Sequence, residues 1–343
     1  MKFFSANNLT QCIKPWYNIV KFLGLMPFRI KKDKFGKENF KLSWMIIFTL
    51  IYYSYFFYAY YWYFPDLSSE NGNINRLVSF VDYVFFPILA MSFITIQVFQ
   101  SKKSYDVLGK ITEIDKTFKL LRITFPYNKI QKCFTIQCAV GFLYHLILFF
   151  VIYPYLSELH QSHLLIPLRI YYFWIDASTL TFLLKSRTIL KVIKEHFIVI
   201  NKNLMLCSEN ITKDRNVSST SDTCDMKLFE VTEHKAKNII EKDKIKKLRT
   251  LHNNLCDVCE IFNEIEEIPI ILVLAYTFII VIANGFFTFY AWHNGKFNMV
   301  GHVLQSIFVV IDCSILGLIL IPMLSKTSKE VRAALNRHYL NKL

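Results

Sequence analysis

Six long apolar stretches constrain the fold of this chain more than any other feature of its sequence. They cover residues 42–64, 77–99, 133–156, 164–184, 268–292 and 299–324. A helix that crosses a bilayer needs about 20 mostly apolar residues, and in lipid a single segment satisfies its backbone by forming a helix. Hydrophobic residues make up 53% of the chain and charged residues only 19%, against about a quarter charged in soluble domains. We therefore predict an all-α polytopic membrane bundle with six transmembrane helices.

The lysines and arginines between these stretches predict which side of the membrane each segment faces. Alternate segments hold 37 of them against 2, and cytosolic segments are the basic ones in membrane proteins. The chain should then be a multi-pass protein of the cell membrane, with both of its ends on the cytosolic side. The predicted parts are a cytosolic N-terminal segment 1–41, transmembrane helices 1–4 in 42–184, a cytosolic insert 185–267, transmembrane helices 5–6 in 268–324 and a cytosolic tail 325–343.

The formal net charge of +14 fits the same topology, because it forms a basic collar on the cytosolic side near the lipid headgroups. A basic chain can also indicate nucleic-acid binding, but here no basic motif lies on a recognisable nucleic-acid-binding module. We therefore expect membrane lipid, and not nucleic acid, to be the partner of this charge.

The insert 185–267 is too long for a plain turn, and it carries two apolar stripes at helical spacing. The first stripe consists of Leu190, Ile193, Phe197, Ile200 and Leu204. The second consists of Leu248, Leu251, Leu255, Val258, Phe262 and Ile265. The polar residues 208–226 between them predict a flexible linker. The stripes predict two helices that continue the fourth and fifth spans, packed either on each other within one chain or in a bundle shared between subunits.

Two segments of the sequence resemble the insect gustatory receptors. Residues 22–28, Phe-Leu-Gly-Leu-Met-Pro-Phe, are similar to the segment that enters the first span of those receptors. Residues 248–257, Leu-Arg-Thr-Leu-His-Asn-Asn-Leu-Cys-Asp, are similar to the cytosolic helix that leads into their penultimate membrane hairpin. The basic tail and the long insert before the fifth span agree, so the resemblance extends over essentially the whole chain.

The resemblance implies a chemosensory subunit of a ligand-gated cation channel that detects small-molecule tastants. It also implies a homo- or hetero-tetramer with other receptor subunits. Receptors of this family have seven spans, and their last helix carries a Thr-Tyr…Gln-Phe signature and lines the pore. The six stretches leave that helix unmatched, and the signature does not follow Leu324. A secondary transporter and a truncated, non-conducting receptor form are the alternatives that stay open.

The resemblance further implies a small-molecule pocket that opens outward among the helices. Such pockets are mostly apolar with a few placed polar groups, and the outward halves of the spans carry side chains of both kinds. The candidate ligand-binding residues are Asp82, Tyr83, Phe86, Tyr144, His145, Phe149, Tyr172, Phe173, Asp176, Asn284, Phe287, Tyr290, His302 and Gln305. Helix packing and interfacial aromatic belts are the competing explanation for most of the aromatic ones.

No motif in the sequence favours an enzyme. Cys256 and Cys259 form a Cys-x-x-Cys sequence, but a zinc site needs two further ligands at matching spacing, and a redox site of this type needs a βαβ context. A Gly-rich phosphate loop, a nucleophile elbow and a His-Glu-x-x-His motif are absent from the sequence. We therefore expect no catalytic residues, no metal site and no cofactor.

Overall fold

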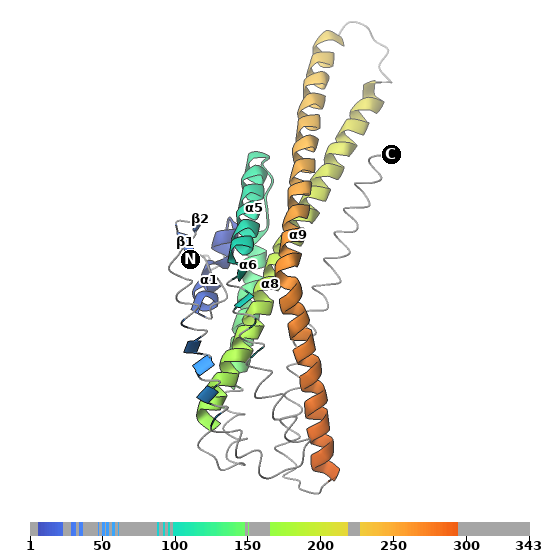
Figure 1. Cartoon of the computed structure of the whole chain (residues 1–343). Coiled ribbons are helices and arrows are strands. Elements are labelled where there is room, and N and C mark those ends of the chain that lie inside the picture. The colour runs from blue at the N-terminus through green and yellow to red at the C-terminus, as the bar shows by residue number, and fades with distance from the viewer. Residues whose placement is uncertain are drawn as a thin grey trace.

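The computed structural model shows an elongated helical molecule (Figure 1). It describes residues 6–22, 29–31, 34–36, 99–147, 165–218 and 227–293, with scattered helical positions at 47, 50, 51, 53, 54, 57, 58, 61, 88, 92, 95, 96 and 150. The continuous helices among these residues are α1 (Leu9–Phe22), α5 (Ser101–Leu120), α6 (Tyr127–Ile147), α8 (Leu165–Ser218) and α9 (Lys227–His293). The predicted helical-bundle class is confirmed for these residues.

The number of membrane spans stays a prediction. Much of the first two predicted spans and all of the sixth lie outside the described residues. Over the portion of the chain that the structure describes, no helix is both long enough and apolar enough to cross a membrane.

A short antiparallel hairpin adds strand structure that the predicted all-α fold did not contain. Strand β1 (Arg29–Lys31) pairs with β2 (Lys34–Gly36), and Ile30 lies opposite Phe35. Two residues connect the strands, which is a common hairpin loop length. Three-residue strands are too short to leave a recognisable alternation in the sequence, so the periodicity that predicted the helices could not reveal them.

Helices α8 and α9 are the longest elements, and they lie against each other where they cross in the middle of the molecule (Figure 1). Each runs without a break between the insert and a predicted span, as the apolar spacing predicted. Helix α8 continues to Ser218, which is inside the range 208–226 predicted as a linker. Many polar residues are tolerated in a helix, so polar composition alone does not show where α8 ends. Residues 219–226 lie outside the described part.

The two apolar stripes are buried within a single chain. In α8, Leu190, Ile193, Phe197 and Ile200 belong to the hydrophobic core, and Leu204 packs against it. All six residues of the α9 stripe, from Leu248 to Ile265, belong to the same core. Of the two arrangements that the sequence left open, packing within one chain therefore accounts for these side chains.

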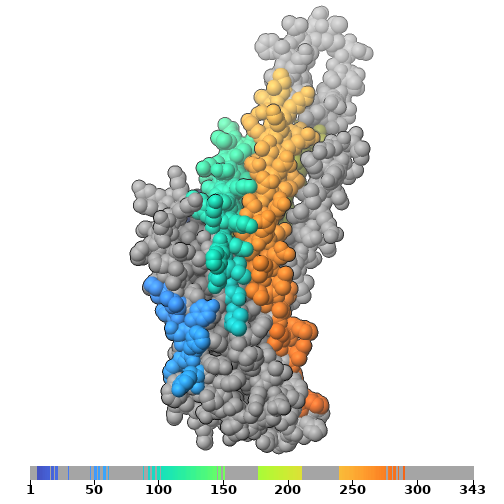
Figure 2. All heavy atoms as spheres, in the orientation of Figure 1, coloured from blue at the N-terminus to red at the C-terminus, as the bar shows by residue number. Residues whose placement is uncertain are grey.

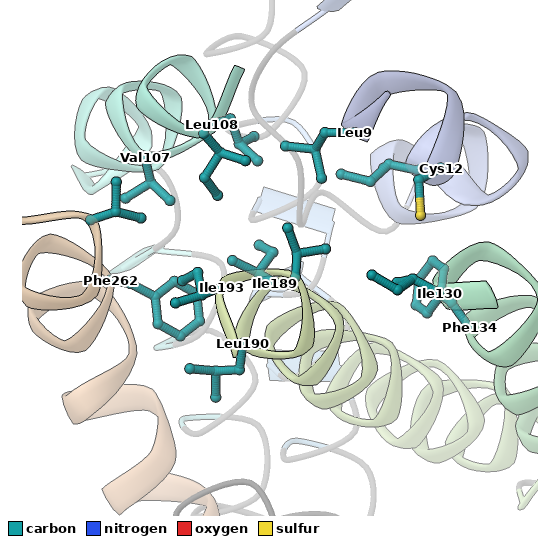
Figure 3. Close-up of a cluster of buried hydrophobic side chains, with 14 of the residues drawn as sticks. Leu9, Cys12, Val107, Leu108, Ile130, Phe134, Ile189, Leu190, Ile193 and Phe262 are labelled. Carbon is teal, nitrogen blue, oxygen red and sulfur yellow. The ribbon is translucent and has the colours of Figure 1, made fainter. Parts of the chain in front are cut away.

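The other three helices surround this crossing and complete the core. Figure 3 shows side chains from five helices meeting there: Leu9 and Cys12 from α1, Val107 and Leu108 from α5, Ile130 and Phe134 from α6, Ile189, Leu190 and Ile193 from α8, and Phe262 from α9. Helix α5 lies alongside α9 on the face shown in Figure 2. The core thus joins α1 to a part of the chain more than a hundred residues away.

Helix α1 has polar contacts that explain both its start and its proline. The Asn8 side chain accepts a hydrogen bond from the backbone N–H of Gln11 at 2.8 Å, which caps the helix. Pro15 has no N–H to donate to the carbonyl of Gln11 four residues earlier. The side-chain amide of Gln131 in α6 donates to that carbonyl at 3.3 Å. The proline thus leaves an acceptor that α6 uses to hold α1 in place.

Candidate functional site

The candidate pocket residues are mostly beyond what the structure describes. Tyr144 in α6 is half-buried. For seven others, only the helical backbone is described: His145 in α6, Tyr172, Phe173 and Asp176 in α8, and Asn284, Phe287 and Tyr290 in α9. Asp82, Tyr83, Phe86, Phe149, His302 and Gln305 lie outside the described residues. The pocket therefore stays a prediction.

The structure instead places three polar side chains together in the core around α8. Asp115 of α5, Tyr127 of α6 and His196 of α8 are all buried. The Tyr127 hydroxyl donates to the Asp115 carboxylate, with oxygen–oxygen distances of 2.6 and 2.5 Å. The Nε2 atom of the His196 ring lies 3.0 Å from the Asp115 carboxylate, and its Nδ1 atom lies 2.7 Å from the Val192 carbonyl. We call these three residues the polar junction.

Aromatic rings enclose the polar junction. Phe118 stacks on the His196 ring with centroids 5.3 Å apart, and Phe125 packs on it at 4.0 Å. These rings exclude water, so the hydrogen bonds act in a medium of low dielectric constant, where they are stronger and where an unpaired group costs more. Burial, and then the neighbouring Asp115 carboxylate, raise the pKa of Tyr127, so its hydroxyl remains a donor.

The turn after α5 positions Phe125 and Tyr127 beside the His196 ring and the Asp115 carboxylate. The backbone N–H of Ile123 donates to the Phe118 carbonyl at 2.9 Å, and that of Arg122 donates to the Lys119 carbonyl at 3.1 Å. This pattern is the Schellman ending of a helix, which needs a residue with positive φ. Arg122 supplies it at φ 56°, where glycine is more usual because it has no Cβ to clash.

Replacing Arg122 by glycine should stabilise the protein by about 1 kcal/mol relative to Arg122→Ala, because only glycine relieves the left-handed strain. Both substitutions remove the guanidinium, so alanine controls for the loss of the side chain. Denaturant unfolding of the full chain in detergent measures the difference. An Arg122→Gly protein no more stable than Arg122→Ala would show that this turn stores no strain.

A second buried polar group lies between α8 and α9. The Ser186 hydroxyl lies 2.7 Å from the Glu266 carboxylate and 3.0 Å from the Phe182 carbonyl. Lys185 is also buried, with its ammonium 5.1 Å from the centre of the Phe182 ring. Burial lowers the pKa of Lys185, and the Glu266 charge opposes that shift. Burial raises the pKa of Glu266, while Lys185 and Ser186 oppose it.

Exposed ion pairs add to the contact between α5 and α9. The Lys103 ammonium lies 2.6 Å from the Glu264 carboxylate, and that of Lys110 lies 3.6 Å from Asp257. Exposed pairs of this kind contribute about 0–1 kcal/mol each and weaken with salt. They therefore contribute little to the stability of this contact.

The described cysteines are free, and burial holds three of them as thiols. Burial raises the pKa of Cys12 and of Cys259 to about 12, and it also raises that of Cys256. Cys256 contacts His252, with 3.8 Å between sulfur and Nδ1. Among the described residues, no three His, Cys, Asp or Glu side chains are grouped so as to hold a metal ion.

Sequence reasoning missed the polar junction, although one signal marked it. Asp115 lies four residues after Ile111 and His196 lies three after Ile193, so both occupy the apolar faces of their helices. A titratable residue on an apolar face is buried when the helix packs, and a buried one needs a partner. The partners come from distant parts of the sequence, so the spacing could not identify them.

Comparison with known families agrees with this helical architecture. The family model described as 7tm Chemosensory receptor matches residues 13–339, which is nearly the whole chain. The match defines a chemosensory receptor, a class of membrane proteins. The chain belongs to the 7tm chemosensory receptor family, and the resemblance found in the sequence is confirmed at this level. A comparison with curated proteins gives no significant match.

Proposed function

We propose that this chain is a gustatory receptor, a subunit of a ligand-gated cation channel in the cell membrane that detects small-molecule tastants. Family membership carries the proposal. The six apolar stretches and the 37-to-2 distribution of basic residues support a multi-pass topology with both ends in the cytosol. In this proposal a tastant binds the outward pocket and favours the open state through contacts that differ between the two states.

The proposal includes assembly with other receptor subunits into a tetramer. The far ends of α8 and α9 project beyond α5 (Figure 1) and carry exposed apolar side chains. These are Met205 and Leu206 in α8 and Ile239 and Ile240 in α9. Contiguous exposed apolar side chains commonly mark a protein–protein contact. Basic residues nearby in α9, such as Lys242 and Lys246, would keep these ends soluble before assembly.

Ligand-evoked current after expression in cells tests the proposed function. The full chain is expressed alone and with a second receptor of the family, and sucrose and quinine are applied as representative sugar and bitter probes. We expect a cation current with at least one combination. Uptake of a probe without current would instead support the transporter, and a surface protein with neither activity would support the non-conducting form.

Two aromatic residues of α6 offer a matched pair for the pocket. Tyr144 is a candidate ligand-binding residue and half-buried, whereas Phe142 is 51% exposed. Tyr144→Ala should raise the concentration of probe that gives half the maximal current, and Phe142→Ala should leave it unchanged. Equal effects of the two substitutions would argue against a pocket at this position.

A further inference from the structure

Two exposed lysines of α5 are matched by acidic residues of α9, whereas the lysines of α1 and α6 have no such match. Lys103 pairs with Glu264, and Lys110 pairs with Asp257. Helices α1 and α6 contain four lysines between them and no aspartate or glutamate. In Figures 1 and 3, α1 and α6 lie on one side of α8 and α9 lies on the other. The acidic residues of α9 are therefore across the bundle from these lysines.

The four lysines are Lys14 and Lys21 in α1, and Lys129 and Lys132 in α6. Lys21 is half-buried, with its ammonium 5.6 Å from the centre of the Tyr17 ring, and the other three are exposed. None of the four forms an ion pair with another residue that the structure describes. Positive charges gathered in this way repel one another, and a bound anion relieves the repulsion.

One contact fixes the lysines of α1 relative to those of α6. The side-chain amide of Gln131 in α6 donates to the Gln11 carbonyl of α1 at 3.3 Å. Lys132 follows Gln131 directly, and Lys14 lies three residues after Gln11, which is less than one helical turn. The apolar face of α1 is buried in the core, so α1 cannot turn its lysines elsewhere. Both helices thus bring a lysine close to the same contact.

The predicted third span places this contact at the level of the lipid headgroups. That span begins at residue 133, so Lys132 precedes it directly, and Lys129 lies about 6 Å further out at a rise of about 1.5 Å per residue. The headgroup layer is about 5–8 Å thick on each side of the hydrocarbon core. The lysines of α6, and the helix α1 that docks beside them, therefore lie at the depth of the lipid phosphates.

We propose that α1 and the cytosolic end of α6 form a binding surface for the anionic headgroups of phospholipids in the cytosolic leaflet. The four lysines supply the positive charge, and each lysine close to an anionic membrane surface strengthens binding about fivefold. The basic collar expected from the sequence is thus unequal around the molecule, because α9 neutralises Lys103 and Lys110 of α5. This surface is separate from the outward pocket, so it stands or fails independently of tastant detection.

Lys14→Gln combined with Lys132→Gln tests the surface, and Lys103→Gln combined with Lys110→Gln is the matched control. Both double variants lose two positive charges, so their net charge falls equally. The full chain is purified in detergent and titrated with a short-chain phosphatidylinositol bisphosphate, and binding is measured by microscale thermophoresis. We expect the Lys14 and Lys132 variant to bind about 25-fold more weakly than wild type, and the control to bind as wild type does. Equal losses in the two variants, or no binding by wild type, would overturn the proposal.

Wild type alone provides a further test, should the double variant not fold. Binding should weaken when the salt concentration rises from about 0.05 M to about 0.5 M, because salt screens exposed charges. Short-chain phosphatidylcholine, whose headgroup has no net charge, should not bind. Free inositol trisphosphate should bind at least about tenfold more weakly, because acyl chains concentrate the lipid in the micelle around the spans. Binding that ignores salt, equal binding of phosphatidylcholine, or equal binding of the free inositol phosphate would each contradict a surface for anionic lipid.

Discussion

Removing the Glu266 carboxylate should lower the free energy of unfolding by about 1–3 kcal/mol, the usual cost of removing one partner of a buried polar contact. In Glu266→Ala, the Lys185 ammonium loses the charge that opposes the effect of burial on its pKa, and Ser186 loses the acceptor that lies 2.7 Å from its hydroxyl. Lys185 then has either to remain charged in an apolar site or to lose its proton, and each of these costs free energy.

Glu264 in the same helix is the matched control. Its carboxylate pairs with Lys103 at 2.6 Å, but the two side chains are 53% and 51% exposed. Glu264→Ala should therefore cost no more than about 1 kcal/mol. Denaturant unfolding of the full chain in detergent compares the two proteins. If both substitutions lower the free energy of unfolding equally, burial does not explain the contribution of Glu266 to stability.

A double substitution tests whether the two buried charged groups, taken together, stabilise the fold. Replacing Lys185 by Met and Glu266 by Leu removes both charges and keeps most of the volume. Buried pairs exchanged in this way are often neutral or even stabilising, so the double variant should recover most of the stability that Glu266→Ala loses. This outcome would show that the pair specifies how α8 and α9 meet more than it stabilises them.

The sequence predicts the long helices because their signal is local. In α8 and α9 the apolar residues recur every three or four positions over many turns, so the period identifies both the helix and its buried face. Phe197 and Val258 occupy that face and are buried. The hairpin β1–β2 and the end of α8 at Ser218 were not predicted, because strands of three residues and a polar helix end carry little periodic signal.

The candidate site is a different case, since its chemistry depends on contacts between distant residues. Asp115 and His196 are 81 positions apart, and Ser186 and Glu266 are 80 apart. No spacing rule connects them, and the nearest sequence signal, a polar residue on an apolar helix face, names no partner. The outward pocket came from the family resemblance, and most of its side chains lie outside the described residues.

The largest effect expected from a single apolar side chain is at Phe197 in the α8 stripe. The side chain is 1% exposed and packs edge-on against the His252 ring of α9, at 5.3 Å between centroids. Truncation of a buried phenylalanine costs about 3–5 kcal/mol, from lost burial and from the cavity that remains. We expect Phe197→Ala to lower the free energy of unfolding by this amount, whereas Lys202→Ala, at an exposed position of the same helix, should change it by less than about 0.5 kcal/mol.

The same substitution tests which chain buries the stripe. Since Phe197 and the α9 residues from Leu248 to Ile265 share one core within a single chain, unfolding of Phe197→Ala should depend on protein concentration in the same way as unfolding of wild type. A stripe shared between subunits would behave otherwise, because the stability of an assembly rises with the concentration of its protomers. Unfolding measured at two concentrations a hundredfold apart distinguishes these cases. A concentration dependence that differs between Phe197→Ala and wild type would place the partner of Phe197 on another subunit, whereas an unchanged dependence supports burial of the stripe within one chain.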